Sequence, residues 1–130
     1  MTLFALVVAS AQIGVILGIS ALAAPTVFAA IEPGAAGRYL RRLFPRYFAT
    51  AAALALVAAA AAITGGEAMA GLLLAADAVC FGSVLALVPR INSARDRGDP
   101  SFRRLHGYSV LGNGLGLVLA LAAIVSMLLH

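Results

Sequence analysis

Residues 68–88, with the sequence AMAGLLLAADAVCFGSVLALV, decide the fold of this chain. Asp77 is the only charged side chain in this stretch, and the other positions are apolar or small. A helix needs about 20 predominantly apolar residues, each rising about 1.5 Å, to cross the hydrocarbon core of a bilayer. We therefore expect residues 68–88 to form a transmembrane helix.

Three more stretches of the chain have the same apolar character and a comparable length. They are residues 3–31, 44–63 and 105–129. Turn-forming or charged segments separate the four stretches, namely Glu32-Pro33-Gly34, the polar turn 64–67 and the charged segment 89–104. The pattern predicts an all-α fold, a four-helix transmembrane bundle that occupies residues 1–130 as a single membrane domain.

The composition supports a membrane protein. The chain is 63% hydrophobic and only 11% charged, with a mean hydropathy of +1.05. A soluble domain carries about a quarter charged residues, so this chain has too few to cover a water-facing surface. The segment Ala21–Ala24 resembles a signal-peptidase site, but no basic residue precedes it and apolar residues continue to Ile31. We expect an uncleaved first helix, because a signal peptide has a basic start.

All nine basic residues are arginines, and they fall in two groups, at residues 38–46 and 90–104. The positive-inside rule assigns arginine-rich connections to the cytoplasm. We therefore predict a multi-pass protein of a bacterial inner membrane, with cytoplasmic loops 32–43 and 89–104 and both termini outside. The arginine groups lack the interleaved aromatics of a nucleic-acid face. The predicted partner is the lipid bilayer, with no nucleic acid.

Two short motifs resemble each other. LRRLF at residues 40–44 precedes Tyr47, and FRRLH at residues 102–106 precedes Tyr108. This recurrence indicates two parallel helical-hairpin repeats, related by an axis along the membrane normal.

Glycines are spaced for close helix packing in the first and last apolar stretches. Gly14 and Gly18 form one pair, and Gly112 and Gly116 form the other. Small residues four positions apart let helix backbones approach one another in a membrane. Two interpretations stay open, packing within one bundle and self-association into a homo-oligomer.

Three polar residues are expected near the membrane midplane, because each lies about ten residues from the start of its stretch, or about 15 Å deep. They are Gln12, Asp77 and Asn113. An ionisable side chain inside a membrane costs about 2.5–3.5 kcal/mol to insert and is by default a functional candidate. The three residues are predicted to form one polar cluster with a binding or transport role, such as a proton or cation relay. The alternative is that they hold the helices together by hydrogen bonds.

A polar stripe is predicted to lead from the midplane to the arginine-rich end. His106, Ser109 and Asn113 recur at i, i+3 and i+7, which places them on one helix face. At the level of His106 we expect Asn92, Arg95 and Asp96 to form a mouth. All of these are candidate binding or transport residues, with a merely structural or interfacial histidine as the alternative.

No metal or cofactor can be assigned from the sequence. Cys80 is the single cysteine, and no Cys/His spacing typical of zinc occurs. A Cu(I) site would use soft ligands, and those at the opposite end are Met1, Met69, Met127 and His130. Haem ligation by two histidines is disfavoured, because His106 and His130 are predicted at opposite faces. No paired-carboxylate, nucleophile–base or phosphate-loop motif argues for an enzyme.

The chain resembles the transmembrane-protein-205-like family, a domain of unknown function, over nearly its whole length. The residues that carry the resemblance are Pro25-x-x-Phe28, Ala36-Gly37, Phe44-Pro45-Arg46-Tyr47-Phe48, Pro89-x-x-Asn92-x-x-Arg95-Asp96 and Phe102-x-x-Leu105-His106-x-x-Ser109-x-x-x-Asn113. The resemblance implies a small four-helix membrane protein, distantly similar to CopD-like copper-resistance proteins and HemJ-type haem-synthesis proteins.

Three functional hypotheses follow. The leading one is transport or resistance-type handling of a metal ion or small cationic solute. The second is a structural or accessory membrane subunit without transport activity. The third is a haem-linked redox protein that uses His106.

Overall fold

The computed structural model describes residues 1–129, and these residues form helices and short connections without a strand. In chain order the elements are α1 (Thr2–Leu17), the π-helical segment η1 (Gly18–Ala23), α2 (Ala24–Ala30), α3 (Pro33–Thr64), α4 (Ala68–Asp96) and α5 (Ser101–Leu128). Four helical spans are long and apolar enough to cross a membrane: Thr2–Ala30, Pro33–Thr64, Ala68–Asp96 and Ser101–Leu128. The predicted all-α fold with four membrane-spanning helices is confirmed.

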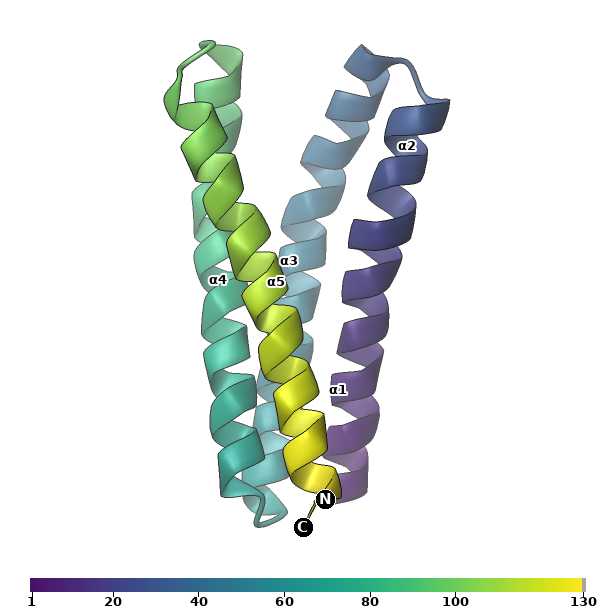
Figure 1. The fold of residues 1–130 in the computed structure, drawn as a ribbon, viewed down its shortest axis with the longest axis vertical. Helices are drawn as coiled ribbons and strands as arrows, with labels where there is room; N and C mark the ends of the chain where they lie inside the picture. The colour runs from purple at the N-terminus through teal and green to yellow at the C-terminus, as the bar shows by residue number, and fades with distance from the viewer. Residues whose placement is uncertain (130) are drawn as a thin grey trace.

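The four spans run antiparallel to their neighbours in the chain (Figure 1). Both termini and the α3–α4 turn lie at one end, which we call the termini end. The connections α2–α3 and α4–α5 lie at the other, which we call the arginine end. The spans lie close together at the termini end and diverge toward the arginine end (Figure 1). Both hairpin connections share an end in any such bundle, so the proposed sequence repeat stays a prediction.

Large apolar side chains cover the outside of the bundle. Leu3, Val79 and Leu111 are 75%, 69% and 69% exposed, on three different spans. A water-soluble monomer rarely exposes a continuous apolar surface of this kind. The surface fits contact with lipid, as expected for a multi-pass membrane protein.

Helices extend beyond the apolar stretches at the arginine end. α3 begins at Pro33, whereas the hydropathy pattern predicted a loop over residues 32–43 and a helix from residue 44. The Glu32 carboxylate accepts hydrogen bonds from the backbone N–H groups of Gly34 and Ala35, at 3.2 and 3.3 Å. Proline suits the first helical position because its missing N–H would have no partner there. The hydropathy pattern did not reveal this helix start, because the first turns of α3 carry arginines and a polar helical turn has the same low hydropathy as a loop.

The second connection is also shorter than the predicted segment 89–104. α4 continues through Pro89 to Asp96, so only residues 97–100 separate it from α5. Gly98 supplies a positive φ of 62° in this turn. The backbone N–H of Ser101 donates to Asp99 at 2.8 Å. This hydrogen bond holds the pKa of the Asp99 carboxyl below its usual range.

The interior changes character along the bundle. At the termini end, all four spans contribute small buried side chains, among them Ala5, Ala58, Ala70 and Ala123. Nearer the arginine end the core holds larger side chains, which are Ile16, Tyr47, Phe48, Phe81 and Val84. Small residues let helix backbones approach closely, whereas aromatic rings keep them apart. This gradient of side-chain size accounts for the divergence of the helices.

The glycines of α5 are used within the chain. A Cβ atom at Gly112 would lie 2.4 Å from Val84, and one at Gly116 would lie 2.4 Å from the Phe81 ring and 2.7 Å from Asp77 Oδ1. These two glycines therefore allow α4 and α5 to touch. A Cβ atom at Gly14 or Gly18 would meet nothing within 4 Å. The predicted self-association through Gly112 and Gly116 is therefore not supported, because this face already packs on α4. Self-association through Gly14 and Gly18 remains a prediction.

Gly116→Ala is expected to lower the free energy of unfolding by about 1–3 kcal/mol, because the added methyl group overpacks the α4–α5 contact. Gly114→Ala is the matched control, since its methyl group would meet nothing within 4 Å. Thermal unfolding in detergent, followed by circular dichroism, measures both variants. Equal melting temperatures for the two variants would contradict this packing.

Candidate functional site

The first span contains a short π-helical segment, η1, just before Pro25. Proline has no N–H, so the carbonyl four residues earlier loses its α-helical partner. In η1 the backbone N–H of Ala24 instead bonds the carbonyl of Ile19, five residues back. Short π-helical turns occur frequently at functional sites. Here the segment carries Ser20.

Ser20 belongs to a ring of three hydrogen-bonded side chains from η1, α3 and α5. The Tyr47 hydroxyl donates to Asn113 Oδ1. Asn113 Nδ2 donates to Ser20 Oγ at 3.3 Å, and Ser20 Oγ lies 3.3 Å from the Tyr47 hydroxyl oxygen. Because Tyr47 uses its only proton toward Asn113, Ser20 is the donor to Tyr47. Each member donates once and accepts once, and the ring joins the two hairpins.

A cavity of about 570 Å³ extends from this ring toward the arginine end. All four spans line it. Its polar lining residues are Ser20, Arg41, Asn92, Arg95, His106, Ser109 and Asn113. Its larger apolar lining residues include Phe28, Leu40, Phe44, Phe48, Val88, Ile91, Phe102 and Val110. Ligand cavities typically measure about 300–1,000 Å³ and combine apolar walls with a few polar groups.

The charged side chains that line the cavity are cationic. Arg41 makes a two-pronged ion pair with Asp96, with Nη1 to Oδ2 at 3.1 Å. The Arg95 guanidinium carbon lies 5.8 Å from the Phe102 ring centroid. Within residues 1–129 the Arg95 side chain makes no hydrogen bond and no ion pair. No carboxylate is among the lining residues. The mouth therefore favours an anionic or neutral group over a cation.

Gln12 and Asp77 form a second, deeper polar site. Both side chains are fully buried, and Gln12 Nε2 donates to Asp77 Oδ2 at 2.6 Å. Asp77 Oδ1 and Gln12 Oε1 have no hydrogen-bond partner in the described protein. Two buried acceptors without donors are costly, so this pair is suited to receive a proton or a polar group. No arginine forms an ion pair with Asp77 within residues 1–129.

An aromatic layer separates the Gln12–Asp77 pair from the cavity. Phe81 lies one helical turn beyond Asp77, toward the arginine end. Its ring packs on Tyr47 and Phe48, with centroids 6.1 and 6.3 Å apart. Phe81 is fully buried, whereas the cavity contacts α4 only from Val88 onward. The expected single midplane cluster is thus two sites, because Asn113 turns to Tyr47 and Ser20 rather than to Asp77.

The sequence-predicted residues separate into three groups in the structure. Five line the cavity: Asn92, Arg95, His106, Ser109 and Asn113. Gln12 and Asp77 form the deeper pair, and Asp96 lies outside the cavity lining and pairs with Arg41. Ser109 donates to the carbonyl of His106 in its own helix at 2.7 Å. Ser20 and Tyr47 were not predicted, although Pro25 could have indicated the irregular turn that presents Ser20.

The described residues contain no group of three or more His, Cys, Asp or Glu side chains that could hold a metal ion. Among the methionines named as soft ligands, Met127 is buried in the alanine-rich core, while Met1 and Met69 are exposed. His130 lies outside the described residues. A metal site therefore has no support from the described part of the chain.

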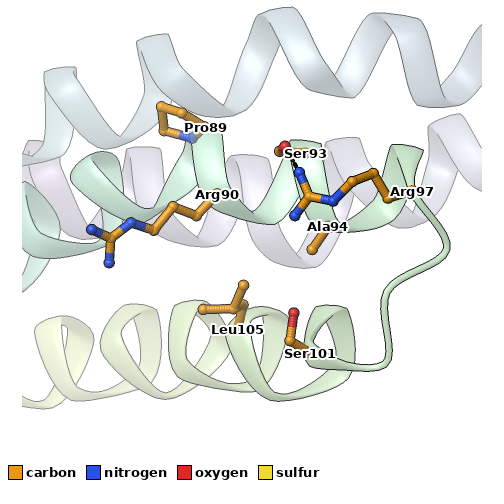
Figure 2. Close-up of a pocket in the computed structure, with 7 residues that line it drawn as sticks. All are labelled: Pro89, Arg90, Ser93, Ala94, Arg97, Ser101 and Leu105. Atoms are coloured by element: carbon orange, nitrogen blue, oxygen red, sulfur yellow. Dashed lines mark hydrogen bonds between the residues drawn. The ribbon is translucent and has the colours of Figure 1, made fainter.

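A second, smaller hollow of about 450 Å³ lies between the end of α4 and the start of α5. Figure 2 shows its seven lining residues, with Arg97 Nη1 bonded to Ser93 Oγ at 2.5 Å and the Arg90 side chain extending away from Ser93. It shares no lining residue with the 570 Å³ cavity, so it belongs to a different face of the hairpin. It has no buried polar group and offers less for binding.

Residues 7–100 match the family DUF4149, a domain of unknown function. The chain belongs to this family. The match covers Ser20, Tyr47, Asp77 and Arg95, while α5 lies beyond it. No curated protein and no solved structure matches the chain. DUF4149 membership confirms a domain of unknown function but does not support the predicted transmembrane-protein-205-like or CopD-like kinship.

Tyr47→Phe is expected to lower the free energy of unfolding by about 1–2 kcal/mol, because it opens the hydrogen-bonded ring and leaves Asn113 Oδ1 without its donor. Tyr39→Phe is the matched control on the same helix, since Tyr39 is 51% exposed and has no side-chain hydrogen bond in the described protein. Unfolding experiments in detergent give the free energy of unfolding of both variants. A Tyr47→Phe variant as stable as wild type would refute a stabilising ring.

Proposed function

We propose that this DUF4149 protein is a small transport-type membrane protein that binds a solute in the cavity between its hairpins. The observation that carries the proposal is the cavity itself, which all four spans line and which reaches the polar side chains of Ser20 and Asn113. Substrate sites near the midplane, open toward one side, are typical of carriers that alternate access.

The termini end is closed in a way that suits one state of such a carrier. Beyond the cavity floor lie the aromatic layer, then Gln12 and Asp77, then the alanine-rich core. A solute that left toward the termini end would pass the unpartnered oxygens of Asp77 and Gln12. We propose that this pair is the second polar station of the path, reached when the Phe81 layer opens.

The charge of the cavity bears on the class of solute. Arg95 lines it, Arg41 is paired with Asp96, and no carboxylate is among the lining residues. We therefore propose an anionic or neutral solute in place of the metal ion or small cation expected from the sequence. Haem ligation is not carried forward either, because a second histidine at the depth of His106 does not occur in the sequence. An accessory subunit would not require an internal cavity with an arginine that lacks a partner.

Asp77→Asn is expected to abolish transport while the protein stays folded. The amide can still accept from Gln12 Nε2 and can donate to Gln12 Oε1, so the pair is kept while the group that can carry charge is removed. Asp99→Asn is the control, because it makes the same chemical change in the loop 97–100, away from the cavity lining and from the Gln12–Asp77 pair. Uptake of radiolabelled small organic acids and neutral amphiphiles into proteoliposomes measures both variants.

Transport is supported if at least one of these solutes enters wild-type and Asp99→Asn proteoliposomes faster than empty liposomes, and Asp77→Asn loses the excess. Equal uptake by Asp77→Asn would refute the role of Asp77. Uptake no faster than empty liposomes for every solute would contradict transport and favour the accessory subunit.

We also propose that the arginine end faces the cytoplasm of a bacterial cell, following the positive-inside rule. In a Cys80→Ala background, Glu67→Cys should react with a membrane-impermeant maleimide added to intact cells. Pro100→Cys should react only after the membrane is opened. The reverse pattern would place the cavity mouth outside.

A further inference from the structure

We propose that the cavity binds a membrane lipid with an acidic headgroup, with the headgroup at Arg95 and an acyl chain along the aromatic wall. The inference rests on the proposed function in one respect, that the cavity is a binding site. It names the class of ligand and the route by which the ligand enters.

The headgroup end of the site consists of cationic and neutral donors. Arg95 reaches across the mouth from α4, with Nη2 about 4.0 Å from the place of a Cβ atom at Gly37 on α3, and with Phe102 of α5 beneath its guanidinium group. A larger residue than glycine at position 37 would narrow this space. The guanidinium fork matches phosphate and carboxylate geometry and forms charge-assisted hydrogen bonds with either group.

The other arginine of the mouth is already neutralised. Arg41 is held by both oxygens of Asp96, which fixes its position at the rim. Arg95 is thus the lining arginine whose side chain makes no hydrogen bond or ion pair within residues 1–129, and Asp96 acts on it only at longer range. An acidic headgroup supplies the missing partner, whereas a zwitterionic headgroup also brings a cation next to Arg41 and Arg95.

The wall of the cavity is continuous with the lipid-facing surface. Phe28 of α2 and Val110 of α5 both line the cavity and are 59% and 57% exposed. A ligand can therefore enter sideways from the bilayer between α2 and α5, without crossing water. This continuity favours a membrane lipid over a water-soluble anion.

The deeper wall accepts an apolar chain. Phe44 and Phe48 stack with centroids 5.7 Å apart, and Val88 and Ile91 face the same cavity from α4. At the floor, Ser20, Tyr47 and Asn113 satisfy one another, so an apolar chain end there leaves none of these three without a partner. A volume of about 570 Å³ suits a headgroup and part of one chain rather than a whole two-chain lipid.

The test uses fluorescence quenching in vesicles. The chain has no tryptophan, so Phe44→Trp provides a single reporter on the cavity wall. The protein is reconstituted with phosphatidylglycerol or phosphatidylcholine that carries the same brominated chains, diluted in unbrominated phosphatidylcholine. Bromine quenches tryptophan on contact, so quenching reports occupancy of the cavity by each lipid.

Brominated phosphatidylglycerol is expected to quench at roughly tenfold lower mole fraction than brominated phosphatidylcholine, as a charge-assisted hydrogen bond implies. Arg95→Gln should abolish the preference, and Arg95→Lys should restore part of it. Arg90→Gln is the matched control, because it removes the same charge from the same helix but lies outside this cavity. Arg90→Gln should keep the preference.

Equal quenching by the two lipids would overturn the proposal. An equal loss of the lipid preference in Arg95→Gln and Arg90→Gln would also overturn it, because it would indicate an effect of general surface charge. Displacement of the brominated lipid by inorganic phosphate alone would also overturn it in favour of a free anion. If solute uptake persists without any lipid preference, the lipid assignment fails while the transport function stands. If circular dichroism shows that Arg95→Gln does not fold, Arg95→Lys replaces it as the test. A reduced preference for phosphatidylglycerol in Arg95→Lys would then support the proposal, and an unchanged preference would overturn it.

Discussion

The size of the side chains that meet between the helices controls the shape of this bundle. Alanines from every span pack together at the termini end, and Tyr47, Phe48 and Phe81 meet nearer the arginine end. In a membrane, lipid chains are as apolar as the interior, so helix association depends on close packing rather than on a hydrophobic drive. The helices therefore close where alanine permits it and diverge where aromatic rings intervene. The cavity is a consequence of this divergence.

Polar groups lie on both sides of the aromatic layer, and Tyr47 belongs to the layer by its ring and to one polar group by its hydroxyl. On one side the Ser20–Tyr47–Asn113 ring closes the cavity floor with its hydrogen bonds satisfied. On the other side Gln12 and Asp77 keep one oxygen each without a donor. A ring whose hydrogen bonds are all satisfied rigidifies the contact between the hairpins. A buried pair with unpaired oxygens instead offers a new hydrogen bond to a proton or ligand that arrives there. This contrast is the physical reason for proposing a structural role for the ring and a functional role for Asp77.

The fold could be predicted from the sequence because hydropathy and length act locally. Residues 68–88 span a bilayer whatever surrounds them, and a fixed rise per residue placed Gln12 and Asp77 at the same depth. The arginine-bearing start of α3 could not be predicted this way, since polar turns of a helix resemble a loop in a hydropathy profile. The partners of Asn113 could not be predicted, because they come from η1 and α3 and depend on how these elements pack against α5. The cationic lining of the mouth could not be predicted either, because the sequence does not show that Asp96 pairs with Arg41 and lies outside the cavity lining.

The cavity opens to water at the arginine end and stops at the aromatic layer, and a cysteine scan along α4 tests this arrangement most directly. Single cysteines from Leu74 to Arg95, in a Cys80→Ala background, would be labelled with a water-soluble maleimide in detergent-free vesicles opened to both sides. Fast labelling is expected at residues 92 and 95, the polar lining positions of α4, and protection is expected at Leu74, Asp77, Phe81 and Val84. Protection of residues 92 and 95 as complete as that of Phe81, or labelling that continues through Phe81 to Leu74, would contradict this arrangement.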